Sequence, residues 1–167
     1  DSWLKNTVEK KSMNFIYDIQ ALEKLIRDPY QRRKFLNAII KKALLPEQLP
    51  EPEFEVFQGL EKLGAGSACL EIIGRHDSKM DGARKLVFKT KDGCRVEAVI
   101  LRIASGRTSL CISSQVGCAA DCQFCATGAM GFVRNLTADE MLDQVLLAKR
   151  LLREEGRQLR NVVVMGM

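Results

Sequence analysis

The sequence has one histidine, one tryptophan and two tyrosines, and it has no long apolar run. No stretch approaches the length needed to cross a bilayer, and the N-terminal residues Asp-Ser-Trp-Leu-Lys lack a signal-peptide pattern. Internal repeats and low-complexity tracts are also missing. These absences exclude a membrane-spanning protein and a repeat architecture. We therefore expect a cytoplasmic protein, with no membrane partner, that acts as a monomer.

The composition predicts a soluble protein. Of the 167 residues, 46% are apolar and 28% are charged, which is enough for one core or for a small domain plus part of a second. The net charge of +5 is a mild bias toward anionic partners such as RNA. Because the chain starts without methionine and stops just after a strand-like run at residues 161–165, we expect the front portion of a longer protein.

The first third of the sequence has a helical pattern. Apolar residues recur at helical spacing from about Asn14 to Leu45, beginning with Phe15 and Ile16. Asp28-Pro29 predicts a break and a new helix start, with aspartate as the cap and proline in the first turn. A linker from Pro46 to Pro52 and a shorter helix over residues 55–63, ending at Gly64 or Gly66, should follow.

The next section favours strands. Residues 85–90 and 95–102 flank Lys91-Asp92-Gly93, a strong hairpin signal, and Ser105-Gly106-Arg107 turns into a third strand at 108–113. These residues predict a three-stranded antiparallel meander.

A βαβ unit should complete the sequence. After a glycine-bearing loop over residues 128–135, Thr137-Ala-Asp-Glu140 reads as a capping box that opens a helix, and a strand near Val162 follows Gly156. The strands at 108–113 and 162–166 should therefore be parallel. The fold class is α/β.

Three cysteines follow the predicted strand at 108–113. Cys118, Cys122 and Cys125 have C-x3-C-x2-C spacing on one short loop, and three thiolates can hold three irons of a [4Fe-4S] cluster while leaving the fourth iron open. A zinc site would need a fourth ligand. Cys111 could supply it, but it lies inside a strand, and the single histidine, His76, is far upstream. The alternative that these cysteines are buried packing thiols fits poorly, because they flank the polar residues Asp121 and Gln123. Six cysteines in an unsecreted chain indicate reduced thiols and metal.

The motif as a whole resembles the radical S-adenosylmethionine enzymes, and within them the RNA adenine methyltransferases of the RlmN/Cfr group. The resemblance is strong over residues 95–167 and weaker over the N-terminal helices. It rests on Cys111-Ile-Ser-Ser-Gln-Val-Gly-Cys118, Cys122-x-Phe-Cys125-Ala-Thr-Gly, Gly131-Phe-x-Arg134-Asn-Leu-Thr137, Asp143-Gln-Val145 and Met165-Gly-Met167.

The resemblance implies a cofactor site. Cys118, Cys122 and Cys125 match the cluster ligands, and the open iron would bind the amine and carboxylate of S-adenosyl-L-methionine. Gly166 matches the start of a turn that binds the amino group of that cofactor. Phe124 could shield the cluster or stack on the adenine, although the residues alone also allow simple apolar cover.

Two further positions match catalytic residues of the family. Cys111 corresponds to the cysteine that resolves a covalent protein–RNA adduct by forming a disulfide with a methyl-carrying cysteine, which lies beyond this sequence. Glu97 corresponds to the proton acceptor. Taken without the family, Cys111 would be a buried strand thiol and Glu97 a carboxylate that shares a wet strand face with Arg95.

The sequence leaves the roles of several other polar residues open. The basic segments Arg32-Arg33-Lys34 and Lys41-Lys42 could contact RNA phosphates or form ordinary solvated helix faces. Arg134-Asn135 could contact phosphate or cap its loop. Cys69 and Cys94 are expected to be structural thiols.

The function implied by the family is methylation of carbon 2 of an adenosine in 23S ribosomal RNA, and of some transfer RNAs, with electrons from a flavodoxin-type reductant. The architecture would be a helical accessory domain with its linker (residues 1–80), an antiparallel hairpin (81–107) and the start of a partial (βα)6 barrel (108–167). Without the rest of the barrel, the chain alone should be inactive. Alternatives are carbon-8 methylation of the antibiotic-resistance type, a radical activase that installs a glycyl radical, and a zinc-stabilised RNA-binding module.

Overall fold

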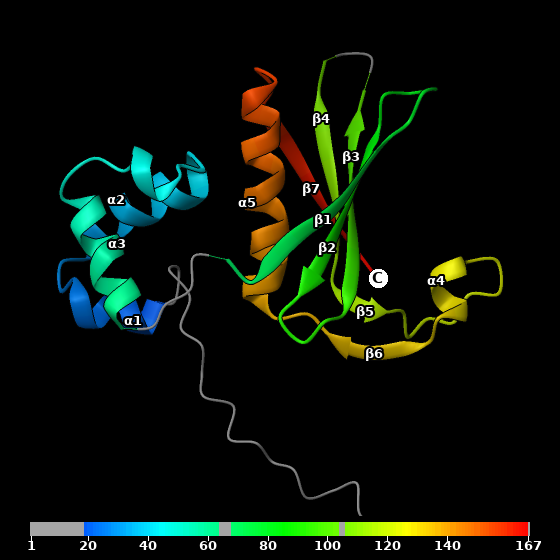
Figure 1. Cartoon of the computed structure of the whole chain (residues 1–167), viewed down its shortest axis with the longest axis horizontal. Coiled ribbons are helices and arrows are strands. Elements are labelled where there is room, and N and C mark those ends of the chain that lie inside the picture. Colours follow the sequence, from blue (N-terminus) through cyan, green and yellow to red (C-terminus); the bar gives the residue numbers. More distant parts are fainter. Residues whose placement is uncertain (1–18, 64–67, 104–105, 167) are drawn as a thin grey trace, which may run out of the picture. The chain divides into compact units, whose positions relative to one another are not determined.

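A computed structural model describes residues 19–63, 68–103 and 106–166 (Figure 1). The chain divides into two compact units, with the boundary between residues 67 and 68. In the described ranges, no helix is both long and apolar enough to span a membrane.

The first unit is helical. It contains α1 (Ile19–Leu25), α2 (Pro29–Leu36), a π-helical turn η1 (Asn37–Lys41), a 3-10 turn η2 (Pro46–Gln48) and α3 (Glu53–Lys62). The predicted break is confirmed, because the carboxylate of Asp28 accepts the N–H of Tyr30 at 2.9 Å and Pro29 is the first residue of α2. Residues 14–18 and the predicted stop at Gly64 or Gly66 lie outside the described residues.

The core of this unit comes from the apolar faces of its helices. Leu22, Phe35, Ile39 and Leu60 are at most 1% exposed. The last helix begins two residues before its predicted start, and its first residue, Glu53, is buried. That burial is compensated by an ion pair with Lys34 at 2.9 Å.

The second unit is built on a five-stranded sheet with the strand order β1-β2-β3-β4-β7. The strands are β1 (Leu70–Asp77), β2 (Arg84–Thr90), β3 (Arg95–Arg102), β4 (Thr108–Ser113) and β7 (Leu159–Met165). The predicted hairpin and the third strand at 108–113 are confirmed, and β4 and β7 are parallel as expected.

The strand β1 was missed. Residues 70–77 fall in the range assigned to the helical domain and its linker, yet they pair with β2 and make four antiparallel strands rather than three. A bulge between Ile72 and Gly74 breaks the alternation of apolar and polar residues that marks a strand in sequence. As an edge strand, β1 also leaves most of its side chains half-buried or exposed.

The connection from β4 to β7 contains α4 (Ala126–Ala129) and α5 (Ala138–Glu154) and a small second sheet. The predicted capping box of α5 is confirmed: the Thr137 hydroxyl accepts the Glu140 N–H at 3.2 Å, and the Glu140 carboxylate accepts the Thr137 N–H at 2.9 Å. The second sheet pairs β5 (Gln115–Gly117) with β6 (Phe132–Asn135), where the sequence predicted only a loop.

The two faces of the main sheet differ. Helix α5 runs along the sheet (Figure 1), and the alternate residues buried on one face of the strands include Val96, Ala98, Ile100, Leu110 and Ile112. The intervening residues of β3 and β4 form the opposite face, where Glu97, Val99 and Cys111 are half-buried. The period of two therefore places the predicted catalytic residues on the less buried face of the sheet.

Candidate cluster site and active site

The three cysteines lie on a loop that leads from β5 to α4. The Cys118 N–H donates to the carbonyl of Gly131 at 3.0 Å, and the Cys125 N–H donates to the carbonyl of Cys122 at 2.9 Å. Two glycines permit this tight path. A Cβ at Gly117 would lie 1.9 Å from the Gly131 oxygen, and one at Gly128 would lie 2.9 Å from the backbone of Cys122.

All three thiols are free and half-buried, so they are open to an incoming group. Cys125 occupies the N-cap position of α4. Hydrogen bonds to its sulfur from the backbone N–H groups of Gly128 and Thr127, and then from the Thr127 hydroxyl, lower the pKa of the Cys125 thiol. The thiolate is the form that binds metal, so this local structure favours ligation.

The loop offers a donor set of three thiols. Within the described ranges, no three Cys, His, Asp or Glu side chains are already placed so that they could hold a metal ion. A tetrahedral zinc needs every sulfur within about 2.3 Å of one centre, whereas thiolates of a four-iron cluster bind separate irons. The chemistry of the donor set, three thiols on one loop, therefore fits an iron–sulfur cluster.

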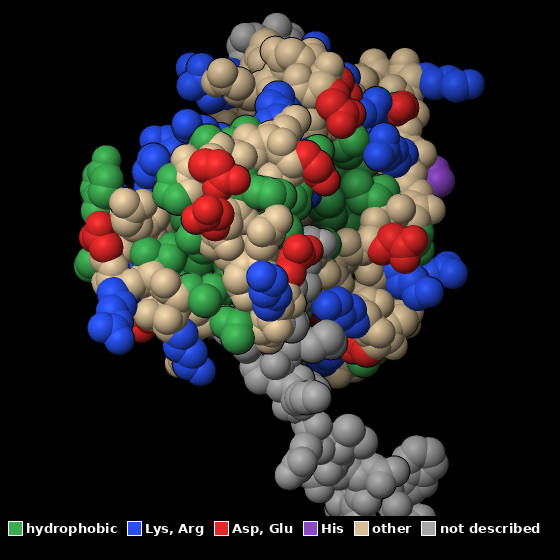
Figure 2. Space-filling view, turned by 60° about the vertical axis from the view of Figure 1, so that its left-hand side comes forward, with side chains coloured by type: hydrophobic (Ala, Val, Ile, Leu, Met, Phe, Trp, Pro, Cys, Tyr) green, Lys and Arg blue, Asp and Glu red, His purple; other side chains and the backbone are tan. Residues whose placement is uncertain are grey.

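His76 does not join this loop. It is exposed on β1, opposite Lys85 in the β1–β2 register, and is the purple side chain at the surface in Figure 2. Lys85 in turn pairs with Val99 on β3, and Val99 pairs with Cys111 on β4. Three strand spacings therefore separate His76 from Cys111, a distance of about 14 Å.

Gly166 lies beside the cysteine loop, immediately after β7. A Cβ at this position would be 2.9 Å from the Cys118 sulfur and 3.6 Å from the side-chain oxygen of Gln115. The two strand ends are held together here, because both the N–H (2.9 Å) and the hydroxyl (2.7 Å) of Ser114 donate to the Met165 carbonyl. The structure thus brings together Gly166 and Cys118, two residues singled out separately in the sequence.

Glu97 and Cys111 line one pocket, of about 150 Å³, on the face of the sheet away from the apolar core. The pocket also includes Val99, Ser113, Thr127, Met165 and Gly166. Cys111 lies opposite Val99 in the β3–β4 register, so Glu97, two residues before Val99, is its diagonal neighbour on the same face.

The polar contacts in this pocket hold both side chains. The Glu97 carboxylate accepts from the Lys85 ammonium at 3.1 Å, with the Glu97 side chain one-third exposed. The Ser113 hydroxyl donates to the Glu97 carbonyl at 2.5 Å. The Cys111 sulfur lies 3.0 Å from the sulfur of Met165. Cys111 is half-buried, rather than a fully buried packing thiol.

Phe124 points away from the protein. Its side chain is 94% exposed and is absent from the residues that line the pocket of Glu97 and Cys111. Apolar cover within the described part of the chain therefore does not explain it. Cys69 is 5% exposed, as expected for a structural thiol, and Cys94 is half-buried.

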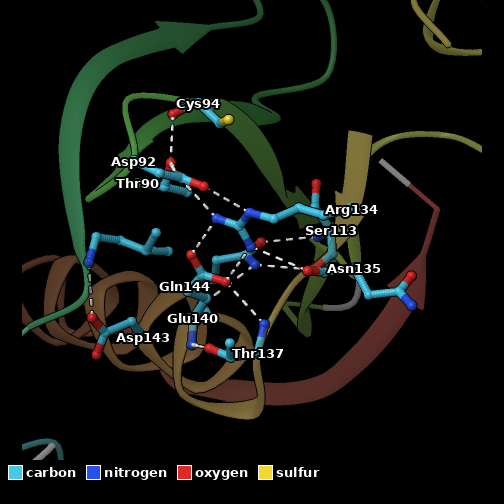
Figure 3. A network of polar contacts seen from close by, with 11 residues as sticks. Thr90, Asp92, Cys94, Ser113, Arg134, Asn135, Thr137, Glu140, Asp143 and Gln144 are labelled. Atoms are coloured by element: carbon cyan, nitrogen blue, oxygen red, sulfur yellow. Dashed lines mark hydrogen bonds and ion pairs between the residues drawn. The ribbon is translucent and has the colours of Figure 1, made fainter. Parts of the chain in front are cut away.

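Arg134 has a structural role that the sequence left open. Its guanidinium donates to Asp92 at 2.8 and 3.0 Å, to Glu140 at 2.8 and 2.8 Å, and to the Asn135 carbonyl at 3.1 Å (Figure 3). Both edges of the planar guanidinium thus already donate to carboxylates, which leaves no free pair of N–H donors for a phosphate. Hydrogen bonds from Arg134 and then Thr90 hold the pKa of Asp92 well below its usual range.

Two buried polar residues of α5 bond to backbone groups of other segments. The buried Gln144 amide accepts the Ser113 N–H at 2.9 Å and donates to the Ser113 carbonyl at 3.0 Å, and the Asp143 carboxylate accepts the N–H groups of Cys69 and Leu70. In the sequence, these residues belong to the segment Asp143-Gln-Val145 that carries part of the family resemblance, and no separate role was predicted for them. Their position on the otherwise apolar stripe of α5 was the signal for a buried polar role.

The basic segments of the helical unit are partly engaged. Lys34 pairs with the buried Glu53, and Arg32 donates to the Ile26 carbonyl at 2.9 Å and lies 3.6 Å from Glu23. On the face that Figure 2 shows, Lys and Arg side chains are spread among Asp and Glu side chains. These contacts favour ordinary helix faces for Arg32 and Lys34.

Comparison with known proteins finds homologues of the chain. No protein-family model matches the chain. A probable RNA methyltransferase of Rhodopirellula baltica is 47% identical over 152 residues, which are 90% of this chain and 38% of that protein. A dual-specificity RNA methyltransferase RlmN of Magnetococcus marinus is 37% identical over 148 residues, 88% of this chain and 41% of that protein.

A solved structure gives the same answer. The crystal structure of a radical SAM methyltransferase from Sphaerobacter thermophilus matches 93% of this chain and 46% of its own, with a TM-score of 0.73 and 33% identity. The chain thus spans less than half the length of these relatives. Over the length that it shares with them, the chain is homologous to RlmN-type RNA methyltransferases and to a radical SAM methyltransferase.

Proposed function

We propose that the protein containing this chain methylates carbon 2 of an adenosine in 23S ribosomal RNA, and also acts on transfer RNA. One observation carries the proposal: the pocket that contains Glu97 and Cys111 ends at Gly166, and Gly166 lies against the sulfur of Cys118. A carboxylate, a free thiol and a cysteine-rich loop that are separate in sequence thus lie around one cavity. The dual-specificity relatives support the choice of RNA as substrate.

Cys118, Cys122 and Cys125 would hold a [4Fe-4S] cluster, and Gly166 and Phe124 would contribute to binding S-adenosyl-L-methionine. When bound, these groups supply the one-electron chemistry that activates an unreactive carbon–hydrogen bond. The lowered pKa of the Cys125 thiol and the half-buried state of all three sulfurs support this role. The electron would come from a flavodoxin-type reductant.

The residues of the pocket have separate tasks. Glu97 would accept the proton that the substrate carbon loses, and Lys85, 3.1 Å away, would orient that carboxylate. Cys111 would attack the sulfur of the methyl-carrying cysteine of the full protein, so that a disulfide forms while the sulfur–carbon bond to the base breaks. The electron pair would stay on that carbon, which takes up a proton as the methylated base is released. Its free thiol and its place as the diagonal neighbour of Glu97 support that assignment.

The decisive experiment uses the full-length protein, reconstituted without oxygen and incubated with 23S RNA fragments, transfer RNA, S-adenosylmethionine and a reductant. Nucleoside mass spectrometry should find 2-methyladenosine. Finding 8-methyladenosine instead would establish the resistance-type reaction, and the absence of any methylated adenosine would overturn the proposal.

Metal analysis separates the enzyme from a zinc-stabilised RNA-binding module. About four irons with sulfide per chain supports the cluster, and stoichiometric zinc contradicts it. Replacing Cys118, Cys122 and Cys125 together by alanine should remove the iron and the activity. The matched change Cys94→Ala, in the β2–β3 turn, should retain both.

The remaining proposals concern the whole protein. The 167-residue chain alone should not methylate RNA, because it spans less than half the length of its relatives. We also propose a partial (βα)6 barrel that starts at β4, and a monomer that works in the cytoplasm. Gel filtration of the full-length protein tests the oligomeric state.

A further inference from the structure

A second cavity, of about 980 Å³, lies at the opposite end of the sheet from the cysteine loop. Its walls come from the turn before β4 and from the segment that leads into β7, and they include Arg107, Arg157, Gln158, Arg160 and Asn161. Since β4 and β7 are parallel, their N-terminal ends meet at this cavity. Their C-terminal ends meet near Cys118.

The register of β4 and β7 explains why Arg160 reaches this cavity. Thr108 pairs with Leu159 and Ser109 pairs with Asn161, so Arg160 has no partner in the ladder. Such a bulge bends the strand and changes the direction of the side chain. The irregularity therefore has a chemical consequence, because it adds a third guanidinium to a cavity that already has two.

The cavity carries positive charge from three arginines, and no acidic lining residue balances it. In the described part of the chain, the exposed side chains of Arg107, Arg157 and Arg160 have no ion pair and no hydrogen bond.

Neighbouring arginines show the opposite arrangement. Arg84 and Arg102 both contact Glu155, at 2.6 and 2.7 Å, and Arg84 also contacts Asp77. The carboxylate of Glu155, adjacent in sequence to the cavity residues, is thus already occupied by two guanidinium groups. With respect to the described residues, the three cavity arginines remain available for an external anion.

We infer that this arginine cavity, defined by Arg107, Arg157 and Arg160, binds backbone phosphates of the RNA substrate. Guanidinium groups match phosphate oxygens in a two-pronged geometry, and three of them on two segments suit a chain of phosphates. An acidic electron-donor protein fits less well. The six residues of β4 place the cavity roughly 20 Å from the cysteine loop that such a protein must approach. The inference rests on the proposed function for the identity of the anion.

The test compares two triple variants of the full-length protein. In one, Arg107, Arg157 and Arg160 are changed to glutamine; in the control, the exposed Lys24, Lys62 and Lys79 are changed to glutamine, which removes the same charge. Binding to a labelled 23S RNA fragment is measured by fluorescence anisotropy over a series of salt concentrations. Thermal unfolding of each variant checks that the fold is intact.

The cavity variant should bind RNA at least about tenfold more weakly, and the slope of log affinity against log salt should fall by roughly two to three units. The control should retain nearly the wild-type affinity and slope. The RNA concentration needed for half-maximal methylation should rise in the cavity variant and stay near the wild-type value in the control.

The outcomes separate this inference from the proposed function. Equal affinities and equal salt slopes for the two variants would overturn the inference and leave methylation untouched. Arginine-dependent RNA binding by a wild-type protein that methylates nothing would support the inference and contradict the proposed function. A wild-type protein that binds no RNA would overturn both.

Discussion

The sulfur of Cys118 lies where a side chain at Gly166 would begin, with only 2.9 Å between the sulfur and an ideal Cβ at that glycine. In the metal-free protein, the Cys118 side chain can rotate away from a methyl group at little cost. Once the sulfur is fixed as an iron ligand, it cannot move. We therefore predict that Gly166→Ala removes most of the iron from reconstituted protein while changing the stability of the metal-free form by no more than about 0.5 kcal/mol.

The matched control is Gly59→Ala in α3. There, the nearest atom to an added Cβ is a Leu25 side-chain carbon at 3.4 Å, and the glycine is inside a helix. This change should leave the iron content unaltered and make the helix more stable by up to about 1 kcal/mol. Iron and sulfide assays, with unfolding curves for the metal-free proteins, measure both effects. Wild-type iron content in Gly166→Ala would show that Cys118 is not held in place as a ligand.

Arg134 should be essential for stability rather than for RNA binding. The change Arg134→Met leaves the largely buried Glu140 carboxylate without its guanidinium partner and releases Asp92. We expect a loss of roughly 1.5–3 kcal/mol, the range for hydrogen bonds to charged groups, measured by urea unfolding. In the control Arg75→Met, an exposed β1 residue loses its charge and the stability should change by no more than about 0.5 kcal/mol. A wild-type unfolding midpoint for Arg134→Met, with weaker RNA binding, would reverse this assignment.

The same network should make the protein sensitive to acid. Hydrogen bonds from Arg134 and Thr90 lower the pKa of Asp92. Burial raises the pKa of Glu140, but the Arg134 and Thr137 hydrogen bonds outweigh it, so that pKa is also lowered. Carboxyl groups with lowered pKa values stabilise the fold fully above their ordinary pKa, about 4, and lose this contribution as the pH falls through their folded-state values.

The free energy of unfolding should therefore fall between roughly pH 5 and pH 2, and it should fall less steeply in Arg134→Met. Unfolding by urea at a series of pH values provides the measurement. If the variant and the wild type lost stability in parallel, other carboxyl groups would have to account for the acid sensitivity.

Local signals in the sequence were reliable where a few neighbouring residues decide the structure. Asp28-Pro29 specified the start of α2, and Thr137 with Glu140 specified the start of α5, because each cap is completed within three residues. The turn at residues 91–93 likewise specified the β2–β3 hairpin. In contrast, β1 depends on pairing with β2 across a bulge, and β6 depends on pairing with β5 across the cysteine loop.

The same contrast between local signals and long-range contacts applies to the functional site. The cysteine spacing indicated a cluster loop, but the role of Arg134 could not be read, because its partner Asp92 is 42 residues away in sequence. The contact between Gly166 and Cys118 needs β7 to run parallel to β4 to its end, a tertiary fact. The arginine cavity depends on the unpaired position of Arg160, which only the register of two strands reveals.

Gln144 links the helix α5 to the end of β4, and the last prediction concerns this residue. Its fully buried amide bonds both the N–H and the carbonyl of Ser113, so it takes the place of a neighbouring strand at the position where β4 leads toward the cysteine loop. Each backbone group left unpaired in a buried place costs about 1–3 kcal/mol. Gln144→Met, which keeps the size of the side chain, should therefore destabilise the protein by roughly 2–6 kcal/mol, the sum over two groups.

Gln144→Glu provides a graded comparison. The carboxylate still accepts the Ser113 N–H but cannot donate to the Ser113 carbonyl, and it also brings a charge into a buried position. Since Ser113 donates its hydroxyl to the Glu97 carbonyl, both changes should also disturb the pocket of Glu97 and Cys111. Methylation at saturating RNA should fall in both variants even at temperatures where unfolding curves show a folded protein. Full activity in a folded Gln144→Met variant would limit this residue to a packing role and separate the end of β4 from the chemistry of the pocket.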